Sequence, residues 1–168
     1  GALDFSFPEV KVEVEEGALH LLPQAEPKAR SLIEELMLLA NRLVAEYLVR
    51  RGLPALYRVH EEPLEEAYGK LRLALARLGY TLPEGVSSRA LQRVLLEAKG
   101  RPEEPVVANL VLRSLRLARY AAENLGHFGL AMEHYLHFTS PIRRYPDLVV
   151  HRVLKAALRR ALTERRKE

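Results

Sequence analysis

The chain has 168 residues, of which 48% are hydrophobic, and a net charge of +4. This size suits one globular domain, and the apolar runs are too short for a membrane span. The absence of cysteine excludes disulfides and thiolate metal sites and makes a reducing, cytoplasmic setting the expected location. Asp4 and Asp147 are the only aspartates, which is too few for the carboxylate cluster that phosphodiester hydrolases often build around paired cations.

The first half of the chain predicts a hairpin followed by helices. Alternating apolar and polar residues over 9–22, interrupted at Glu16-Gly17, indicate a β-hairpin. Apolar residues at helical spacing predict a long helix over residues 28–51 and a second helix over 64–78. The short stretch 56–60 between them ends near a proline and predicts a strand or an extended connector.

The second half predicts three helices and one extended segment. In chain order, these are a helix from the N-cap Ser87 through Glu97, a helix from Pro105 to about Asn124, an extended segment over residues 130–139, and a last helix that begins at the N-cap Ser140. No repeat or linker divides the chain. The predicted fold class is therefore α+β and predominantly α-helical, with an N-terminal β-hairpin and a short extended segment before the last helix.

Positive charge gathers at one end of the sequence. Residues 141–168 contain nine Lys or Arg and three acidic residues, whereas the preceding 140 residues are slightly acidic. A basic segment of this kind suits a phosphate-rich partner, because arginine matches phosphate oxygens with a planar fork of donors. A solvated helix end explains the same composition, and charge alone does not separate the two interpretations.

Three histidines, His127, His134 and His137, lie close together in sequence and are candidates for metal ligands. Residues three apart on an extended segment face opposite sides, so His134 and His137 are not expected to converge. The chain also lacks the zinc-binding, phosphate-loop and nucleophile-elbow motifs. The sequence therefore predicts no metal site in this chain.

The segment 137–152 carries the strongest chemical signal. It combines Ser140, the adjacent Arg143 and Arg144, and the free N–H groups of a starting helix, a combination that favours anion binding. Arg143, Asp147 and His151 recur at four-residue spacing and would share one face of a regular helix. The alternative is a pair of ordinary ion pairs on a surface helix.

The run His-Phe-Thr-Ser-Pro-Ile-Arg-Arg-Tyr-Pro-Asp-Leu-Val-Val-His-Arg at 137–152 resembles the signature of the ribonuclease II / ribonuclease R family, whose catalytic domain is the RNB domain. Further stretches resemble the second half of that domain, in the same order. They are Gly-Ala-Leu-Asp-Phe at 1–5, Leu-Ile-Glu-Glu-Leu-Met-Leu-Leu-Ala-Asn at 32–41, Tyr-Arg-Val-His-Glu at 57–61, Leu-Arg-Ser-Leu at 112–115 and Gly-His-Phe-Gly-Leu at 126–130. Departures from the family pattern at Arg30, Leu36 and Leu115 leave the arginine signature intact.

The resemblance implies that residues 1–168 are the C-terminal part of an RNB catalytic domain. The parent protein would be a 3′→5′ hydrolytic exoribonuclease that degrades single-stranded RNA to nucleoside 5′-monophosphates. The family's Mg²⁺ is held by aspartates upstream of the matched stretch, and its cold-shock-type and S1-type modules are absent here. We therefore expect this chain alone to be inactive and to need the upstream half of its own catalytic domain as a partner.

The resemblance also implies roles for individual residues. Arg143 matches the family's essential arginine and would stabilise charge on the phosphoryl oxygens in the transition state. Ser140, Arg144 and Arg152 would position phosphates, although Arg144 has a structural role as its alternative. Glu34 or Glu35 matches the family carboxylate that accepts a hydrogen bond from a ribose 2′-OH, and the sequence leaves open which of the two does so.

Two functions of other classes remain possible at this point. A noncatalytic RNA-binding or adaptor module would use the same basic helix and need no aspartates. A purely structural helical fragment would use neither the basic helix nor the carboxylates. The subtype within the family and the oligomeric state are not determined by the sequence.

Overall fold

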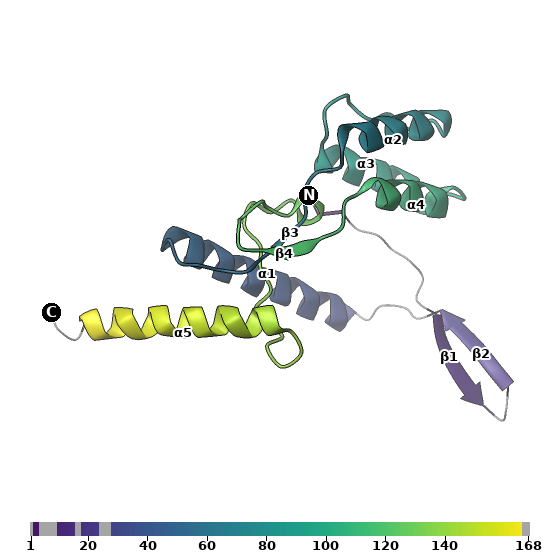
Figure 1. Cartoon of the computed structure of the whole chain (residues 1–168). Coiled ribbons are helices and arrows are strands. Elements are labelled where there is room, and N and C mark those ends of the chain that lie inside the picture. Colours follow the sequence, from purple (N-terminus) through teal and green to yellow (C-terminus); the bar gives the residue numbers. More distant parts are fainter. Residues whose placement is uncertain (1, 4–9, 16–17, 24–27, 166–168) are drawn as a thin grey trace.

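The computed structural model of the chain describes residues 2–3, 10–15, 18–23 and 28–165 (Figure 1). Five α-helices dominate these ranges, which confirms the predominantly helical α+β prediction. In chain order the elements are β1 (Val10–Glu15), β2 (Ala18–Pro23), α1 (Lys28–Arg50), β3 (Tyr57–Val59), α2 (Glu65–Arg77), α3 (Ser88–Ala98), α4 (Glu104–Ser114), β4 (Arg119–Ala121), the 3₁₀ turn η1 (Phe128–Leu130) and α5 (Tyr145–Arg165).

The predicted hairpin is confirmed. Strands β1 and β2 pair antiparallel, with Val10 opposite Pro23 and Glu15 opposite Ala18. The predicted break at residues 16–17 and Asp4 lie outside the described residues. In Figure 1 the hairpin lies to one side of the helices.

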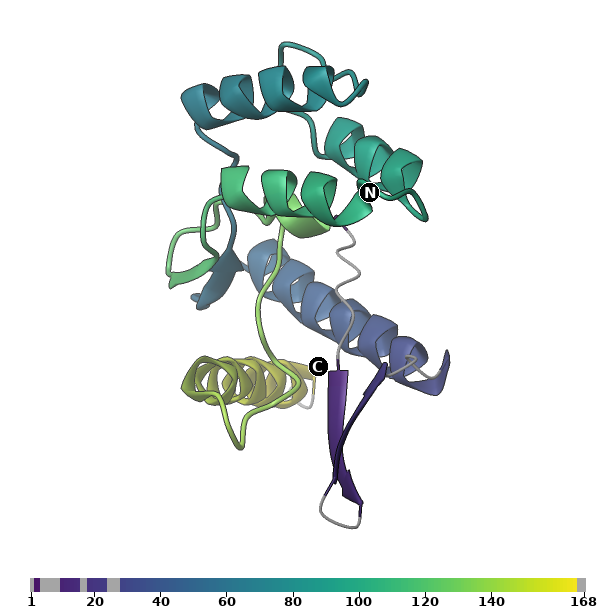
Figure 2. The ribbon, with the colours of Figure 1, turned by 90° about the vertical axis from the view of Figure 1, so that its right-hand side faces the viewer.

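Helices α2, α3 and α4 form the first of two cores. Their apolar faces bury Leu75, Leu91, Val94 and Val107 with almost no exposure. The predicted N-cap is confirmed, because the Ser87 hydroxyl accepts a hydrogen bond from the Ala90 N–H over 3.3 Å. Figure 2 shows these three helices stacked together on one side of the molecule.

The second core lies between α1, strand β3 and α5. Its fully buried members include Ala45 and Leu48 of α1, Leu136 of the segment before α5, and Val150 of α5 itself. Strand β3 pairs antiparallel with β4, so a short two-stranded ribbon lies beside this core. None of the helices in the described ranges has the length and apolar content that a membrane crossing needs.

Two predicted helix boundaries are wrong. The helix expected to run to Asn124 ends at Ser114, because Leu115 takes an extended conformation and residues 119–121 pair with β3 instead. Neither glycine nor proline marks this end in the sequence, and the strand pairing is a long-range effect that local propensity does not report.

The last helix begins at Tyr145 and not at Ser140. Pro146 has no N–H, and its ring disfavours helical backbone one turn earlier. Residues 141–143 form a turn instead, in which the Ser140 carbonyl accepts hydrogen bonds from the N–H groups of Arg143 over 3.3 Å and Arg144 over 3.0 Å.

The first core makes a direct stability prediction. Leu91→Ala removes a fully buried side chain from α3, so we expect the free energy of unfolding to fall by about 2–5 kcal/mol. Leu96→Ala on the same helix is the matched control, because Leu96 is 59% exposed. Urea denaturation of the two variants measures the difference, and equal losses would contradict the assignment of this core.

Candidate functional site

Residues 140–144 form a turn that presents two arginines directly before α5, and we call it the arginine turn. The side chain of Arg143 is exposed and makes no hydrogen bond or ion pair within the ranges that the structure describes. Its neighbour Ile142 is fully exposed, at 102% of its reference area. The turn therefore offers an uncompensated guanidinium at its tip.

A buried carboxylate fixes the base of this turn. Asp147 has 0% exposure, and its Oδ2 accepts hydrogen bonds from the Ser140 N–H over 2.9 Å and from Nε and Nη2 of Arg144 over 3.1 and 2.8 Å. Burial of a charge is tolerated only where hydrogen bonds and an opposite charge compensate it. Asp147 therefore holds the backbone at Ser140 and the side chain of Arg144.

This pairing changes two sequence predictions. Arg143, Asp147 and His151 do not form one helix face, because the helix begins at Tyr145 and the partner of Asp147 is Arg144. The Ser140 side chain was expected to cap the helix, whereas the Asp147 carboxylate accepts the backbone N–H of Ser140. The structural alternative for Arg144 is thereby supported.

Helix α1 holds the segment before the turn through a residue that the sequence analysis missed. Asn41 is 3% exposed, and its Oδ1 accepts hydrogen bonds from the N–H groups of Phe138 over 2.9 Å and Thr139 over 3.2 Å. Its Nδ2 donates to the Tyr135 hydroxyl over 3.1 Å. The sequence contained one signal for this role, namely an amide side chain in the middle of the apolar face of a helix.

Helix α5 contributes a second clamp. The His151 Nε2 donates to the Phe138 carbonyl over 2.8 Å, and the two rings stack 4.0 Å apart with planes inclined by 10°. Both backbone groups of Phe138 are therefore bonded, one to α1 and one to α5. The arginine turn follows a segment that two helices hold in place.

The three histidines of the sequence analysis do not converge. His134 Nδ1 bonds the Asn124 amide over 2.6 Å, His137 Nδ1 bonds the Tyr120 hydroxyl over 2.8 Å, and His127 Nδ1 accepts the Leu130 N–H over 3.2 Å. Across the described ranges, no group of three or more metal-ligating side chains gathers.

Asp147 has a second carboxylate oxygen, Oδ1, which is buried without a hydrogen-bond partner.

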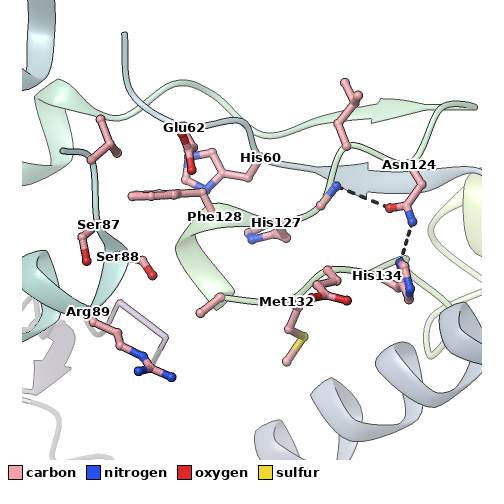
Figure 3. A pocket seen from close by; sticks show the side chains of 15 residues that line it. His60, Glu62, Ser87, Ser88, Arg89, Asn124, His127, Phe128, Met132 and His134 are labelled. Atoms are coloured by element: carbon pink, nitrogen blue, oxygen red, sulfur yellow. Dashed lines mark hydrogen bonds between the residues drawn. The ribbon is translucent and has the colours of Figure 1, made fainter. Parts of the chain in front are cut away.

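A pocket of about 690 Å³ lies between the start of α3 and the loop around η1 (Figure 3). Its histidines serve the fold. His60 accepts the Gly129 N–H at Nδ1 over 3.0 Å and uses Nε2 to bond the Arg116 carbonyl over 2.8 Å. A Cβ at Gly129 would meet His60 Nδ1 at 2.8 Å, so the close approach requires glycine.

The second histidine of the pocket, His127, is neutral at pH 7, because burial lowers its pKa to about 4.

The remaining predicted site residues lie outside the arginine turn, on helices α5 and α1. Arg152 is exposed on α5 and has no ion pair among the described residues. Glu34 and Glu35 are exposed on α1, where Glu34 lies 3.6 Å from Arg30. The N-terminal ends of α1 and α5 lie on the same side of the molecule in Figure 1, but the two helices diverge in Figure 2.

Comparisons with known proteins find similar sequences. The family model described as the RNB domain matches residues 1–160. Ribonuclease R of Aquifex aeolicus is 47% identical over 163 residues, which are 95% of this chain and 23% of that protein. The chain spans about a fifth of the length of the curated relatives that it matches.

Solved structures of RNase R also resemble the structure of this chain. RNase R of Mycoplasma genitalium in its apo form gives a TM-score of 0.80 at 36% identity, over 92% of this chain and 25% of that one. The same protein in complex with ribose methylated single-stranded RNA gives the same score and identity. Yeast Ssd1, described as a pseudonuclease, gives 0.69 at 30% identity over 76% of this chain and 16% of its own. The family resemblance predicted from the sequence is confirmed.

The buried carboxylate makes the second testable prediction. Asp147→Asn leaves Arg144 without its counter-charge, so we expect the free energy of unfolding to fall by about 2–4 kcal/mol. This is lower than the usual loss for a fully buried ion pair, because the Arg144 side chain is 22% exposed. Urea denaturation measures the loss, and amide hydrogen exchange should speed up at Ser140 and Arg144.

Glu46→Gln is the matched control for this change. Glu46 and Arg42 both lie on helix α1 and form an exposed ion pair, in which water screens the charges. We expect a much smaller loss of stability than for Asp147→Asn. Losses of equal size would show that Asp147 does not hold the turn.

Proposed function

The chain belongs to the RNB domain family, and we propose that it forms the C-terminal part of the catalytic domain of a 3′→5′ hydrolytic exoribonuclease. The substrate of the parent enzyme would be single-stranded RNA, and its products would be nucleoside 5′-monophosphates. The observation that carries this proposal is the arginine turn, which holds the exposed Arg143 on a base fixed by the buried Asp147.

Arg143 is the proposed catalytic residue of this chain. Attack on a phosphodiester builds negative charge on the phosphoryl oxygens, and a guanidinium placed beforehand stabilises that charge without reorganisation. The support is threefold: the side chain is exposed, it makes no ion pair in the described part of the chain, and its turn is bonded at Ser140 to Asp147. An arginine already paired with a carboxylate would offer less positive charge.

Ser140, Arg144 and Arg152 are proposed to position the RNA phosphates. Two donors of Arg144 point at Asp147, which leaves other N–H groups of its guanidinium for a phosphate oxygen. Arg152 extends the positive surface along α5 and is exposed. The hydroxyl of Ser140 is the donor proposed for a phosphate, because its backbone N–H already donates to Asp147.

The donor set of the described residues does not fit Mg²⁺. Asp147 already accepts three hydrogen bonds and the charge of Arg144, and no other cluster of ligating side chains forms in these ranges. We propose that the Mg²⁺ of the parent enzyme is bound by aspartates outside this chain. It follows that this chain alone would be inactive on RNA.

The upstream half of the same catalytic domain is the proposed protein partner. One side of α1 exposes large apolar side chains that a soluble surface rarely gathers, each about half or more exposed: Leu32, Ile33, Leu36, Leu39 and Leu43. Covering them with the rest of the domain would remove this apolar area from water.

A noncatalytic RNA-binding module is the second candidate. The likeness to yeast Ssd1, described as a pseudonuclease, favours it, because this fold also occurs without the nuclease function. Both candidates predict RNA binding. Hydrolysis of RNA by the full-length protein separates them.

The test of the proposed function is Arg143→Ala in the full-length enzyme. We expect turnover to fall by roughly 10²–10³ or more while the affinity for RNA falls far less, because the interaction is made mainly in the transition state. Arg143→Lys should recover only part of the rate, since a point charge lacks the bidentate fork. Release of nucleoside monophosphates from single-stranded RNA measures the rates.

Two controls accompany this experiment. The 168-residue chain with Mg²⁺ should release no nucleoside monophosphates. Arg77→Ala, an exposed arginine on α2, should leave turnover unchanged. An Arg143→Ala enzyme that turns over normally, or that loses only affinity, would reassign Arg143 to positioning.

Recognition of the sugar makes a separate prediction. We propose that Glu34 or Glu35 accepts a hydrogen bond from a ribose 2′-OH, with Glu35 favoured because Glu34 pairs with Arg30. Glu35→Ala in the full-length enzyme should then slow cleavage of RNA by about ten- to a hundredfold and affect a substrate with deoxyribose at that position less.

Glu34→Ala is the matched variant for this experiment, one residue away on the same helix. We expect it to be nearly neutral towards both substrates. Equal effects of each variant on ribose and deoxyribose substrates would mean that neither carboxylate reads the sugar.

A further inference from the structure

A second group of cationic and aromatic side chains lies beside the arginine turn and has no role in the function proposed above. The guanidinium of Arg58, on β3, lies 4.8 Å from the ring centre of Tyr120, on β4. The Tyr120 hydroxyl bonds Nδ1 of His137 over 2.8 Å, and the two rings meet edge to face at 5.6 Å. We call Arg58, Tyr120 and His137 the ribbon cluster.

His137 of the ribbon cluster lies three residues before Ser140, where the arginine turn begins. The positive charges of Arg144, Arg58 and Arg143 all act on the His137 ring, and Asp147 is the opposing charge. Burial and these cations lower the pKa of His137 to about 4, so the ring is neutral at pH 7. His137 therefore joins two sets of arginines without adding a charge of its own.

Positive charge in this region is not balanced by the protein. Arg58 and Arg143 make no ion pair with any residue in the described ranges, and Asp147 is committed to Arg144. The neighbouring Arg116 and Arg119 differ, because both pair with Glu61 over 3.2 Å. On the ribbon itself, Arg58 therefore keeps an unpaired guanidinium, whereas Arg119 does not.

Aromatic rings beside free arginines are the elements that bind single-stranded nucleic acids. Bases stack on tyrosine rings and guanidinium planes, and arginines bind the phosphates between them. Tyr120 is 37% exposed, so part of its ring is accessible although Arg58 lies over it. The tyrosine hydroxyl is bonded to His137, which fixes the orientation of the ring.

We propose that the ribbon cluster is an RNA-binding subsite next to the arginine turn, in which Arg58 binds one phosphate and an adjacent base packs on the exposed part of Tyr120. The inference rests on the proposed function, since it names further contacts to the same RNA. It assigns RNA contacts to two strands that are distant from the arginine turn in sequence. Strand β3 lies more than 80 residues before the turn, and β4 lies some 20 residues before it.

The experiment measures RNA binding by the 168-residue chain in the absence of metal. A fluorescein-labelled oligouridylate of about 12 nucleotides, within the range of typical single-strand sites, is titrated at low salt and followed by fluorescence anisotropy. Arg58→Ala and Tyr120→Ala should each weaken binding by about three- to tenfold, and Arg58→Ala should reduce the salt dependence by about one phosphate contact.

Arg77→Ala is the matched control, because it removes the same charge from an exposed position on α2. It should leave the affinity unchanged to within about twofold, which is the error of such a titration. Circular dichroism checks that each variant is folded. In the unchanged protein, the ring resonances of His137 should shift on addition of the oligouridylate, a readout that needs no variant.

The outcomes separate the two proposals. Unchanged binding for both Arg58→Ala and Tyr120→Ala, while the unchanged chain binds RNA, would overturn the ribbon subsite and leave the proposed function standing. His137 resonances that stay unchanged while RNA binds would also overturn the subsite. Absence of any RNA binding by the unchanged chain would count against both.

Discussion

The carboxylate of Asp147 has no exposure to water, and the geometry around the arginines depends on how that charge is compensated. Three N–H groups, one from Ser140 and two from Arg144, surround one of its oxygens, so the chain must fold back over the start of α5. Asn41 fixes the preceding residues from the side of α1. Of the two arginines in the turn, Arg143 is the one whose side chain remains exposed once these bonds are made.

The sequence predicted the helices that have their own local signals and missed the features that depend on distant partners. The capped helix after Ser87 and the long α1 were predicted because caps and apolar spacing are local. The early end of α4 was missed because its cause is pairing of β4 with β3. Arg143 was predicted from its motif, whereas the role of Asn41 required knowledge of residues 138 and 139.

The histidines show why residue type alone was a poor guide to chemistry. Residue type makes His127 and His137 candidates for metal ligands, yet these two rings and that of His60 each use a ring nitrogen to bond a backbone group or a hydroxyl. Their low pKa values follow from burial, and a neutral imidazole supplies one donor and one acceptor in these places. His60 bonds Arg116 and His137 bonds Tyr120, so these two rings connect separate segments, whereas His127 caps its own turn η1.

The two cores differ in how far apart in sequence their contacts lie, and this difference has a consequence for folding. Helices α2 to α4 are consecutive, so their core closes short loops and is expected to form early. The bonds from Asn41 to Tyr135, Phe138 and Thr139 span 94, 97 and 98 residues. Each of these requires closure of a long loop, which costs entropy before any contact forms. The arginine turn is therefore expected to acquire its geometry late, after the helices on which it depends have already docked.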